Sequence, residues 1–161
     1  MRRLLGPLFG LLLIAGFFLG SPSTAHAKSF SGHWIDVNLS TERTTAYNGS
    51  TPVYTALVTS GRPGYPTPTG SFSIVSRVYN ETMTSWIFGI PPSAPGGYYV
   101  PDVLYTQYFD WNGDALHDNY WSPSSAFGSY GTSHGCVGMR VNDAAFFWNF
   151  ATYGTPVEVH Y

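Results

Sequence analysis

The sequence has 161 residues, of which 17% are aromatic and only 10% are charged, with 18 glycines, 12 prolines and 12 tyrosines. Few charges and many turn-forming residues argue against a helix bundle, and the aromatic content argues against a disordered chain. The length suits one domain of ordinary size. Only five basic residues follow position 27, and they are scattered among nine acidic ones. Because phosphate binding needs clustered Lys and Arg, the composition argues against nucleic acid as a partner.

The first 27 residues have the pattern of a secretory signal peptide. Arg2 and Arg3 form a short positive region, Leu4 to Gly20 is largely apolar, and Ala25-His26-Ala27 resembles a peptidase cleavage site. The alternative is an uncleaved membrane anchor, because the apolar stretch is close to a spanning length. We therefore expect an exported protein, secreted or held in the cell wall or periplasm, whose single domain covers residues 28–161. Its contact with a membrane would be limited to the signal peptide before cleavage.

In the rest of the chain, segments of strand character alternate with turns. Apolar residues at every second position predict a strand over residues 35–39. Asn48-Gly49 favours a tight hairpin turn, because both residues tolerate positive φ. Enrichment in β-branched and aromatic residues predicts further strands over five segments: residues 43–47, 53–59, 71–79, 85–90 and 98–109.

A single helix is predicted late in the chain. Asn142 is expected as its N-cap, apolar residues run from Ala144 to Ala151, and Tyr153-Gly154 ends it. Residues 157–161 then alternate as a closing strand. The expected architecture is a mostly β domain with one late α-helix.

Cys136 is the only cysteine, so no intramolecular disulfide can form. A lone cysteine in an exported protein is either a small buried hydrophobe or a reactive thiol. The glycine-rich context of Ser133-His134-Gly135-Cys136 favours the reactive thiol, because Gly135 lets the backbone bend sharply and leaves the sulfur uncovered. A thiol is a poor nucleophile until it loses its proton, and a nearby imidazolium can lower its pKa.

Two histidines could act as the partner of this thiol. His134 lies two residues before Cys136, and His117 lies earlier in the chain, with 15 residues between it and Ser133. His117 could meet the thiol only if the loop between them folds back across a sheet. The residues alone leave the choice of base open, and they offer no cluster of ligands for a metal.

His117 followed at this distance by Ser133-His134-Gly135-Cys136 resembles the signature of the L,D-transpeptidase (YkuD-like) catalytic domain family. The resemblance extends from about Trp34 to Tyr161, nearly all of the chain after the signal peptide. Its other parts fall in the expected order: residues 35–39, the hairpin formed by 58–61 and 67–72, and residues 154–157.

The resemblance implies a β-sandwich-like fold, with Cys136 as the nucleophile and His117 as the proton donor and acceptor, and with no metal or cofactor. His134 and Gly135 would shape the pocket, and Ser133 would orient groups around the imidazole. Three further side chains are candidates for substrate binding: Tyr120, Trp121 and Arg140. The family often has Asn or Arg two positions after the cysteine, where this chain has Gly138, and Arg140 is the candidate substitute.

The implied function is an exported L,D-transpeptidase that cross-links peptidoglycan stem peptides through a thioester on Cys136 and that carbapenems acylate. It would take part in peptidoglycan biosynthesis, cell wall organisation and cell shape. Two alternatives stay open: an L,D-carboxypeptidase, in which water resolves the thioester, and a non-catalytic module that binds peptidoglycan. A thiol oxidoreductase is disfavoured, because no second cysteine could resolve a mixed disulfide.

Overall fold

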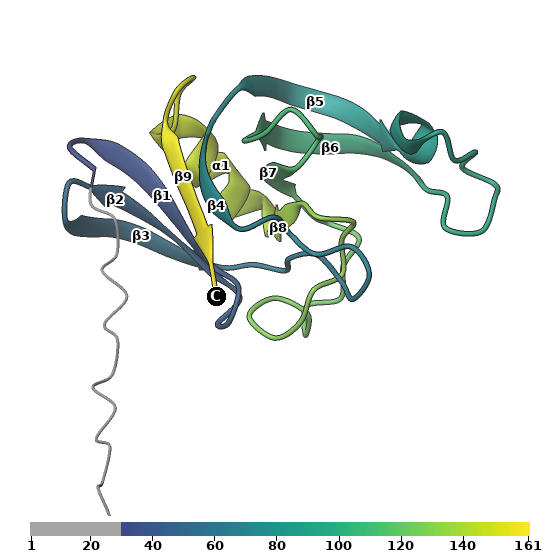
Figure 1. Cartoon of the computed structure of the whole chain (residues 1–161), viewed down its shortest axis with the longest axis horizontal. Helices are drawn as coiled ribbons and strands as arrows, with labels where there is room; N and C mark the ends of the chain where they lie inside the picture. Colours follow the sequence, from purple (N-terminus) through teal and green to yellow (C-terminus); the bar gives the residue numbers. More distant parts are fainter. Residues whose placement is uncertain (1–29) are drawn as a thin grey trace, which may run out of the picture.

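The computed structural model describes residues 30–161, so the predicted signal peptide at residues 1–27 lies outside the described part of the chain. Two β-sheets and one α-helix make up the fold (Figure 1). The first sheet has the order β3-β2-β1-β9-β4 and the second the order β5-β6-β7-β8. The mostly β architecture with one late helix is therefore confirmed. No helix within residues 30–161 is long and apolar enough to cross a membrane.

The first sheet is built from the two ends of the described chain. Its strands are β1 (His33–Asn38), β2 (Arg43–Asn48), β3 (Thr51–Leu57), β4 (Gly70–Ser73) and β9 (Pro156–His160). The predicted turn joins β2 to β3, with Gly49 at a φ of 59°. Strand β9 runs parallel to β1 and antiparallel to β4, so the last strand of the chain lies inside the sheet.

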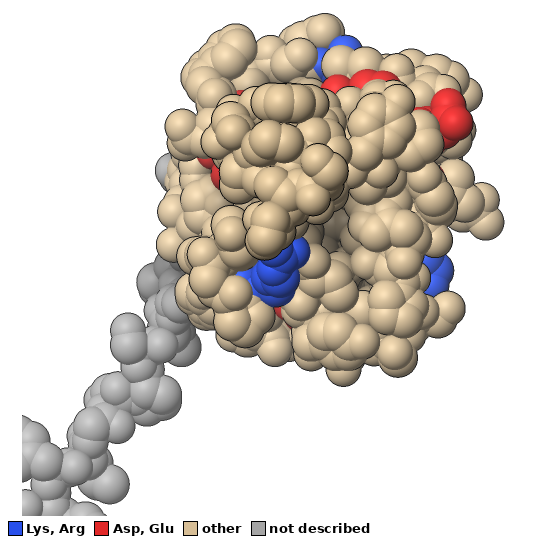
Figure 2. Space-filling view, turned by 90° about the vertical axis from the view of Figure 1, so that its right-hand side faces the viewer, with Lys and Arg blue, Asp and Glu red and all other residues tan. Residues whose placement is uncertain are grey.

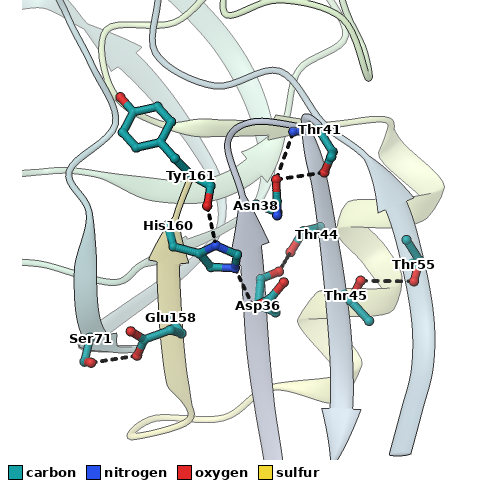
Figure 3. Close-up of polar contacts among 10 residues, drawn as sticks. All are labelled: Asp36, Asn38, Thr41, Thr44, Thr45, Thr55, Ser71, Glu158, His160 and Tyr161. Carbon is teal, nitrogen blue, oxygen red and sulfur yellow. Dashed lines mark hydrogen bonds and ion pairs between the residues drawn. The ribbon is translucent and has the colours of Figure 1, made fainter. Parts of the chain in front are cut away.

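Polar side chains connect β9 to both of its neighbours (Figure 3). His160 Nε2 lies 2.9 Å from Asp36 Oδ1 on β1. On the other side, Ser71 Oγ of β4 donates to Glu158 Oε2 at 2.6 Å. These contacts are largely exposed, so the burial of the opposite face supplies most of the stabilisation.

The second sheet carries a long hairpin that extends away from the body of the molecule (Figure 1). Strands β5 (Ser76–Thr84) and β6 (Tyr99–Tyr108) form this hairpin, which includes the short 3-10 helix η1 (Ser85–Phe88). Strands β7 (Ala115–Asp118) and β8 (Val137–Met139) complete the sheet as a parallel pair.

Helix α1 (Val141–Phe150) packs between the two sheets. It contacts β6 and β7 on one side, and Phe146 stacks on Tyr54 of β3 at 3.9 Å between ring centroids. The buried core draws on both sheets and on the helix, with its largest members being Phe109, Phe147, Ile35, Ile74, Leu116 and Met139. This shared core fixes the second sheet against the first.

Three local predictions were wrong. Residues 71–79 form two strands rather than one, because Ile74 and Val75 cross from the first sheet to the second. Residues 85–90 contain η1 rather than a strand, since Thr84 caps it and Gly89 ends it at a φ of 70°. Helix α1 begins at Val141 with Arg140 as its N-cap, not Asn142, and no side chain caps it.

Candidate active site

The parallel pairing of β7 and β8 brings the remote histidine to the cysteine. In the register of these strands, His117 pairs with Gly138, and Cys136 directly precedes β8. Both His117 and Cys136 line one cavity of about 330 Å³. The 15 residues between His117 and Ser133 therefore form the return loop that the sequence analysis required.

The backbone of the Cys136 loop is held from three directions. Ser133 Oγ donates to the Cys136 carbonyl at 2.6 Å and accepts from the Gly135 N–H at 3.0 Å. Thr67 Oγ1 donates to the Gly135 carbonyl at 2.7 Å. Gly135 has a φ of 134°, and a Cβ there would lie 2.1 Å from Asp114 Oδ1, so only glycine fits. Ser133 thus supports the loop backbone, and its expected role around the imidazole stays a prediction.

Cys136 is half-buried, and its surroundings favour the neutral thiol. Burial raises its pKa to about 12, and Asp114, Asp110 and Glu81 push the pKa in the same direction against one opposing backbone hydrogen bond from Ala115. Sγ donates to the Gly113 carbonyl at 3.6 Å. The pKa shift is opposite to the lowering by an imidazolium that the sequence predicts, because the surroundings of the thiol are desolvated and acidic.

His117 is neutral as well, and its tautomer is fixed. The ring is 2% exposed, and burial lowers its pKa to about 4 against the opposing hydrogen bond to the Asp118 carbonyl. Nδ1 lies 2.6 Å from that carbonyl oxygen. Since a carbonyl only accepts, Nδ1 carries the proton and Nε2 is left as an acceptor. The imidazole can therefore act as a base through Nε2.

His134 is held by Arg62, a residue that the sequence analysis did not single out. Arg62 Nη2 donates to His134 Nε2 at 2.6 Å. The imidazole also contacts the rings of Tyr65 and Tyr98, at 4.6 and 5.0 Å between centroids. Burial and then the charge of Arg62 lower the pKa of His134. A neutral His134 therefore serves as an acceptor for the guanidinium and not as a second cation.

Two cavities meet at Cys136. The cavity of about 330 Å³ that His117 lines also includes Arg62, and we call it the Arg62 cavity. The second cavity, of about 220 Å³, includes Glu81 and Asp114, and we call it the Glu81 cavity. His134, Met83 and Tyr98 line both. Figure 2 shows the face toward which the β5–β6 hairpin projects, with few charges and a hollow next to basic side-chain atoms.

The predicted substrate-binding residues lie in different surroundings. Trp121 lines the Arg62 cavity and stacks on His117 at 5.7 Å. Tyr120 is 56% exposed and donates to the Pro101 carbonyl, and the Arg140 guanidinium lies over the Phe127 ring. Neither Tyr120 nor Arg140 is among the residues that line the two cavities. Within residues 30–161, no three His, Cys, Asp or Glu side chains are grouped to hold a metal.

Asp114 and Glu81 also escaped the sequence analysis. Asp114 stands three residues before His117, and Asp110 Oδ1 accepts from the backbone N–H groups of Asn112, Gly113 and Asp114. That Asx turn is readable in Asp110-Trp111-Asn112-Gly113-Asp114, whereas nothing local indicates that Glu81 or Arg62 faces the cysteine.

Comparisons with known proteins identify the family. A family model described as the L,D-transpeptidase catalytic domain matches residues 32–159. L,D-transpeptidase 1 of Mycobacterium tuberculosis is 35% identical over 99 residues, which are 62% of this chain and 39% of that protein. This chain therefore spans well under half the length of that relative.

Two solved structures are similar in fold over most of the chain. An L,D-transpeptidase in complex with imipenem has a TM-score of 0.76 and 29% identity, covering 80% of this chain and 59% of that one. L,D-transpeptidase 3 from Mycobacterium tuberculosis, in complex with a faropenem-derived adduct, has a TM-score of 0.74 and 27% identity, covering 81% and 60%. The chain belongs to the L,D-transpeptidase catalytic domain family.

Proposed function

We propose that this protein is an L,D-transpeptidase that acts on peptidoglycan stem peptides with Cys136 as its nucleophile. The observation that carries the proposal is the shared cavity of Cys136 and a neutral His117 whose Nε2 can accept a proton. Membership of the family and the similarity to proteins solved with imipenem and a faropenem-derived adduct support it.

The first half-reaction forms a thioester. His117 Nε2 takes the proton of the thiol while Cys136 Sγ bonds to the carbonyl carbon of the L-centre in a donor stem. The tetrahedral intermediate collapses as the C–N bond to the terminal D-residue breaks, and His117 returns the proton to the leaving amine. Because both groups are neutral at rest, the proton moves during the attack and not before it.

The oxyanion of this intermediate needs a backbone donor. Ser133 Oγ already engages the Gly135 N–H. In this loop, the Cys136 N–H is therefore the candidate donor. In the second half-reaction an amine of a neighbouring stem, deprotonated by His117, attacks the thioester and restores the thiol.

Two finer points belong to the same proposal. Residues 1–27 act as a cleaved signal peptide, so the exported enzyme begins at Lys28, which N-terminal sequencing of the exported protein would test. An amine rather than water resolves the thioester. An L,D-carboxypeptidase would use the same residues, so only the products separate the two activities.

Intact-mass analysis tests the proposal. After exposure to imipenem or to a donor stem peptide, the wild-type protein should gain one covalent adduct, and Cys136→Ala should gain none while keeping its circular dichroism spectrum. With donor and acceptor stems together, the cross-linked dimer should exceed the hydrolysed donor. No adduct on folded wild-type protein, or turnover by Cys136→Ala, would exclude the cysteine mechanism, and hydrolysis alone would make the protein a carboxypeptidase.

A further inference from the structure

The two cavities beside Cys136 carry opposite charges. The Glu81 cavity includes the carboxyl groups of Glu81 and Asp114 and no Lys or Arg. The Arg62 cavity includes Arg62 and no Asp or Glu. Of the Lys and Arg side chains within residues 30–161, Arg62 alone lines either cavity. A charged substrate bound across Cys136 therefore meets a different potential on each side of the sulfur.

The Arg62 side chain is fixed in place but has no anionic partner. Its backbone N–H donates to the Ser133 carbonyl at 3.0 Å, and its guanidinium lies over the Tyr65 ring at 4.6 Å. Nη2 donates to His134 Nε2, and Nη1 lies 3.4 Å from His134 Nδ1. The ion pair found within residues 30–161 joins His160 and Asp36 and does not involve Arg62. A guanidinium has five N–H donors, so donors remain for a ligand.

The proposed reaction supplies an anion at this place. The terminal D-residue of a donor stem carries a free carboxylate, and this group is separated from the scissile nitrogen by a single α-carbon. When the scissile carbonyl reaches Cys136 Sγ, the carboxylate must lie close to the sulfur. Glu81, joined by Asp114 where that group is ionised, would repel it on one side, whereas Arg62 would attract it on the other. A planar guanidinium also matches a carboxylate in geometry.

We propose that Arg62 binds the carboxylate of the leaving D-residue, so that the Arg62 cavity receives the leaving group and the Glu81 cavity faces cationic parts of the substrates. This inference rests on the proposed function. His134 is then a positioning residue, because its neutral ring holds the guanidinium at the cavity wall. Arg62 selects stems in which the D-residue is terminal, since a further residue would remove the charge from that position.

The test compares two donor peptides that differ only at the C-terminus. Both are tetrapeptide stems ending in D-alanine, one with a free carboxylate and one with a carboxamide, and kcat/KM is measured for release of the last residue. The variants are Arg62→Gln, which removes the positive charge, and Arg62→Lys, which keeps the charge but lacks the planar guanidinium group. Arg43→Gln is the matched control, because Arg43 is exposed on β2 and lines neither cavity.

The wild-type enzyme should prefer the carboxylate donor by about 10- to 100-fold. Arg62→Gln should abolish this preference by lowering kcat/KM for the carboxylate donor alone, Arg62→Lys should keep part of it, and Arg43→Gln should match the wild type. An equal loss for both donors in Arg62→Gln would overturn the inference, because it would show a structural role through His134. Equal kcat/KM values of the wild-type enzyme for the two donors would also overturn the inference, although the proposed function would then stand. Release from neither donor would overturn the proposed function itself.

Discussion

At the scale of single residues, Gly138 shows how this chain departs from the pattern expected of its family. A Cβ added at Gly138 would lie 2.3 Å from Asn119 Nδ2 and 2.7 Å from Asn119 Cβ. Asn119 is 2% exposed, and its amide nitrogen and oxygen have no hydrogen-bond partner within the described residues. The side chain that follows β7 therefore fills the space that a side chain on β8 would need.

This contact predicts that positions 119 and 138 are coupled in stability. Gly138→Ala should lower the free energy of unfolding by about 1–3 kcal/mol, because the added methyl group overpacks a closed site. In an Asn119→Gly background the same substitution should cost much less, since its clashing partner is gone. Urea unfolding of the four proteins in this double-mutant cycle gives the coupling energy. Additive effects would show that the Asn119 side chain moves away without cost.

At the scale of secondary-structure elements, a buried carboxylate joins the first sheet to the loop of Cys136. Glu42 lies between β1 and β2 and is 7% exposed. Its carboxylate accepts from the backbone N–H and the hydroxyl of Ser60, at 2.8 and 2.6 Å. The Ser60 carbonyl in turn accepts from the N–H groups of Thr132 and Ser133. This chain of hydrogen bonds fixes where the loop begins.

Removing that carboxylate should therefore affect both stability and catalysis. Glu42→Ala leaves two buried donors of Ser60 without a partner, so the free energy of unfolding should fall by about 2–3 kcal/mol. Acylation by imipenem should also slow, because the loop before Cys136 loses its anchor. Chemical denaturation and intact-mass kinetics measure the two effects. The control is Glu158→Ala, which removes an exposed carboxylate bonded to Ser71 and should stay within about 0.5 kcal/mol; an equally small effect at Glu42 would contradict the role of this anchor.

Elements that depend on local signals could be predicted from the sequence, and elements that depend on distant partners could not. Alternation over 35–39 and the Asn48-Gly49 turn are local, and both correspond to observed structure. The division of residues 71–79 depends on the partners of Ile74 and Val75, which are the carbonyls of Thr155 and Tyr108. Helix α1 starts early because it follows β8 with only Arg140 between them.

At the scale of the whole molecule, the site is assembled from segments that only the fold brings together. The motif around Cys136 and the distant His117 could be read from the sequence, because spacing and residue type carry that signal. Arg62 comes from a loop before β4 and Glu81 from β5, and the cavity each one lines is set by how the two sheets pack. The pKa of the thiol was mispredicted for the same reason, since it is set mainly by burial.

The assembled charges predict the pH dependence of acylation. His117, with a pKa lowered by burial to about 4, must be neutral to accept the proton, so the rate should fall at acid pH as the ring becomes protonated. Burial, reinforced by Asp110, raises the pKa of Asp114 to about 7. Above that pH an ionised Asp114 opposes negative charge on the sulfur and on the oxyanion, so the rate should decline by several-fold. Acylation should thus be fastest between about pH 4 and 7.

Intact-mass kinetics with imipenem across this pH range would measure the profile. Asp114→Asn should remove the decline above pH 7 and leave the acid limb unchanged, because the acid limb belongs to His117. His117→Gln should slow acylation by about 10²- to 10⁴-fold at every pH, since no base remains to take the thiol proton. If the wild-type rate instead rose steadily from pH 7 to 9, the thiol would be ionising with an ordinary pKa. The resting pair of neutral thiol and neutral imidazole would then be the wrong description of this site, because attack would proceed from a thiolate formed beforehand.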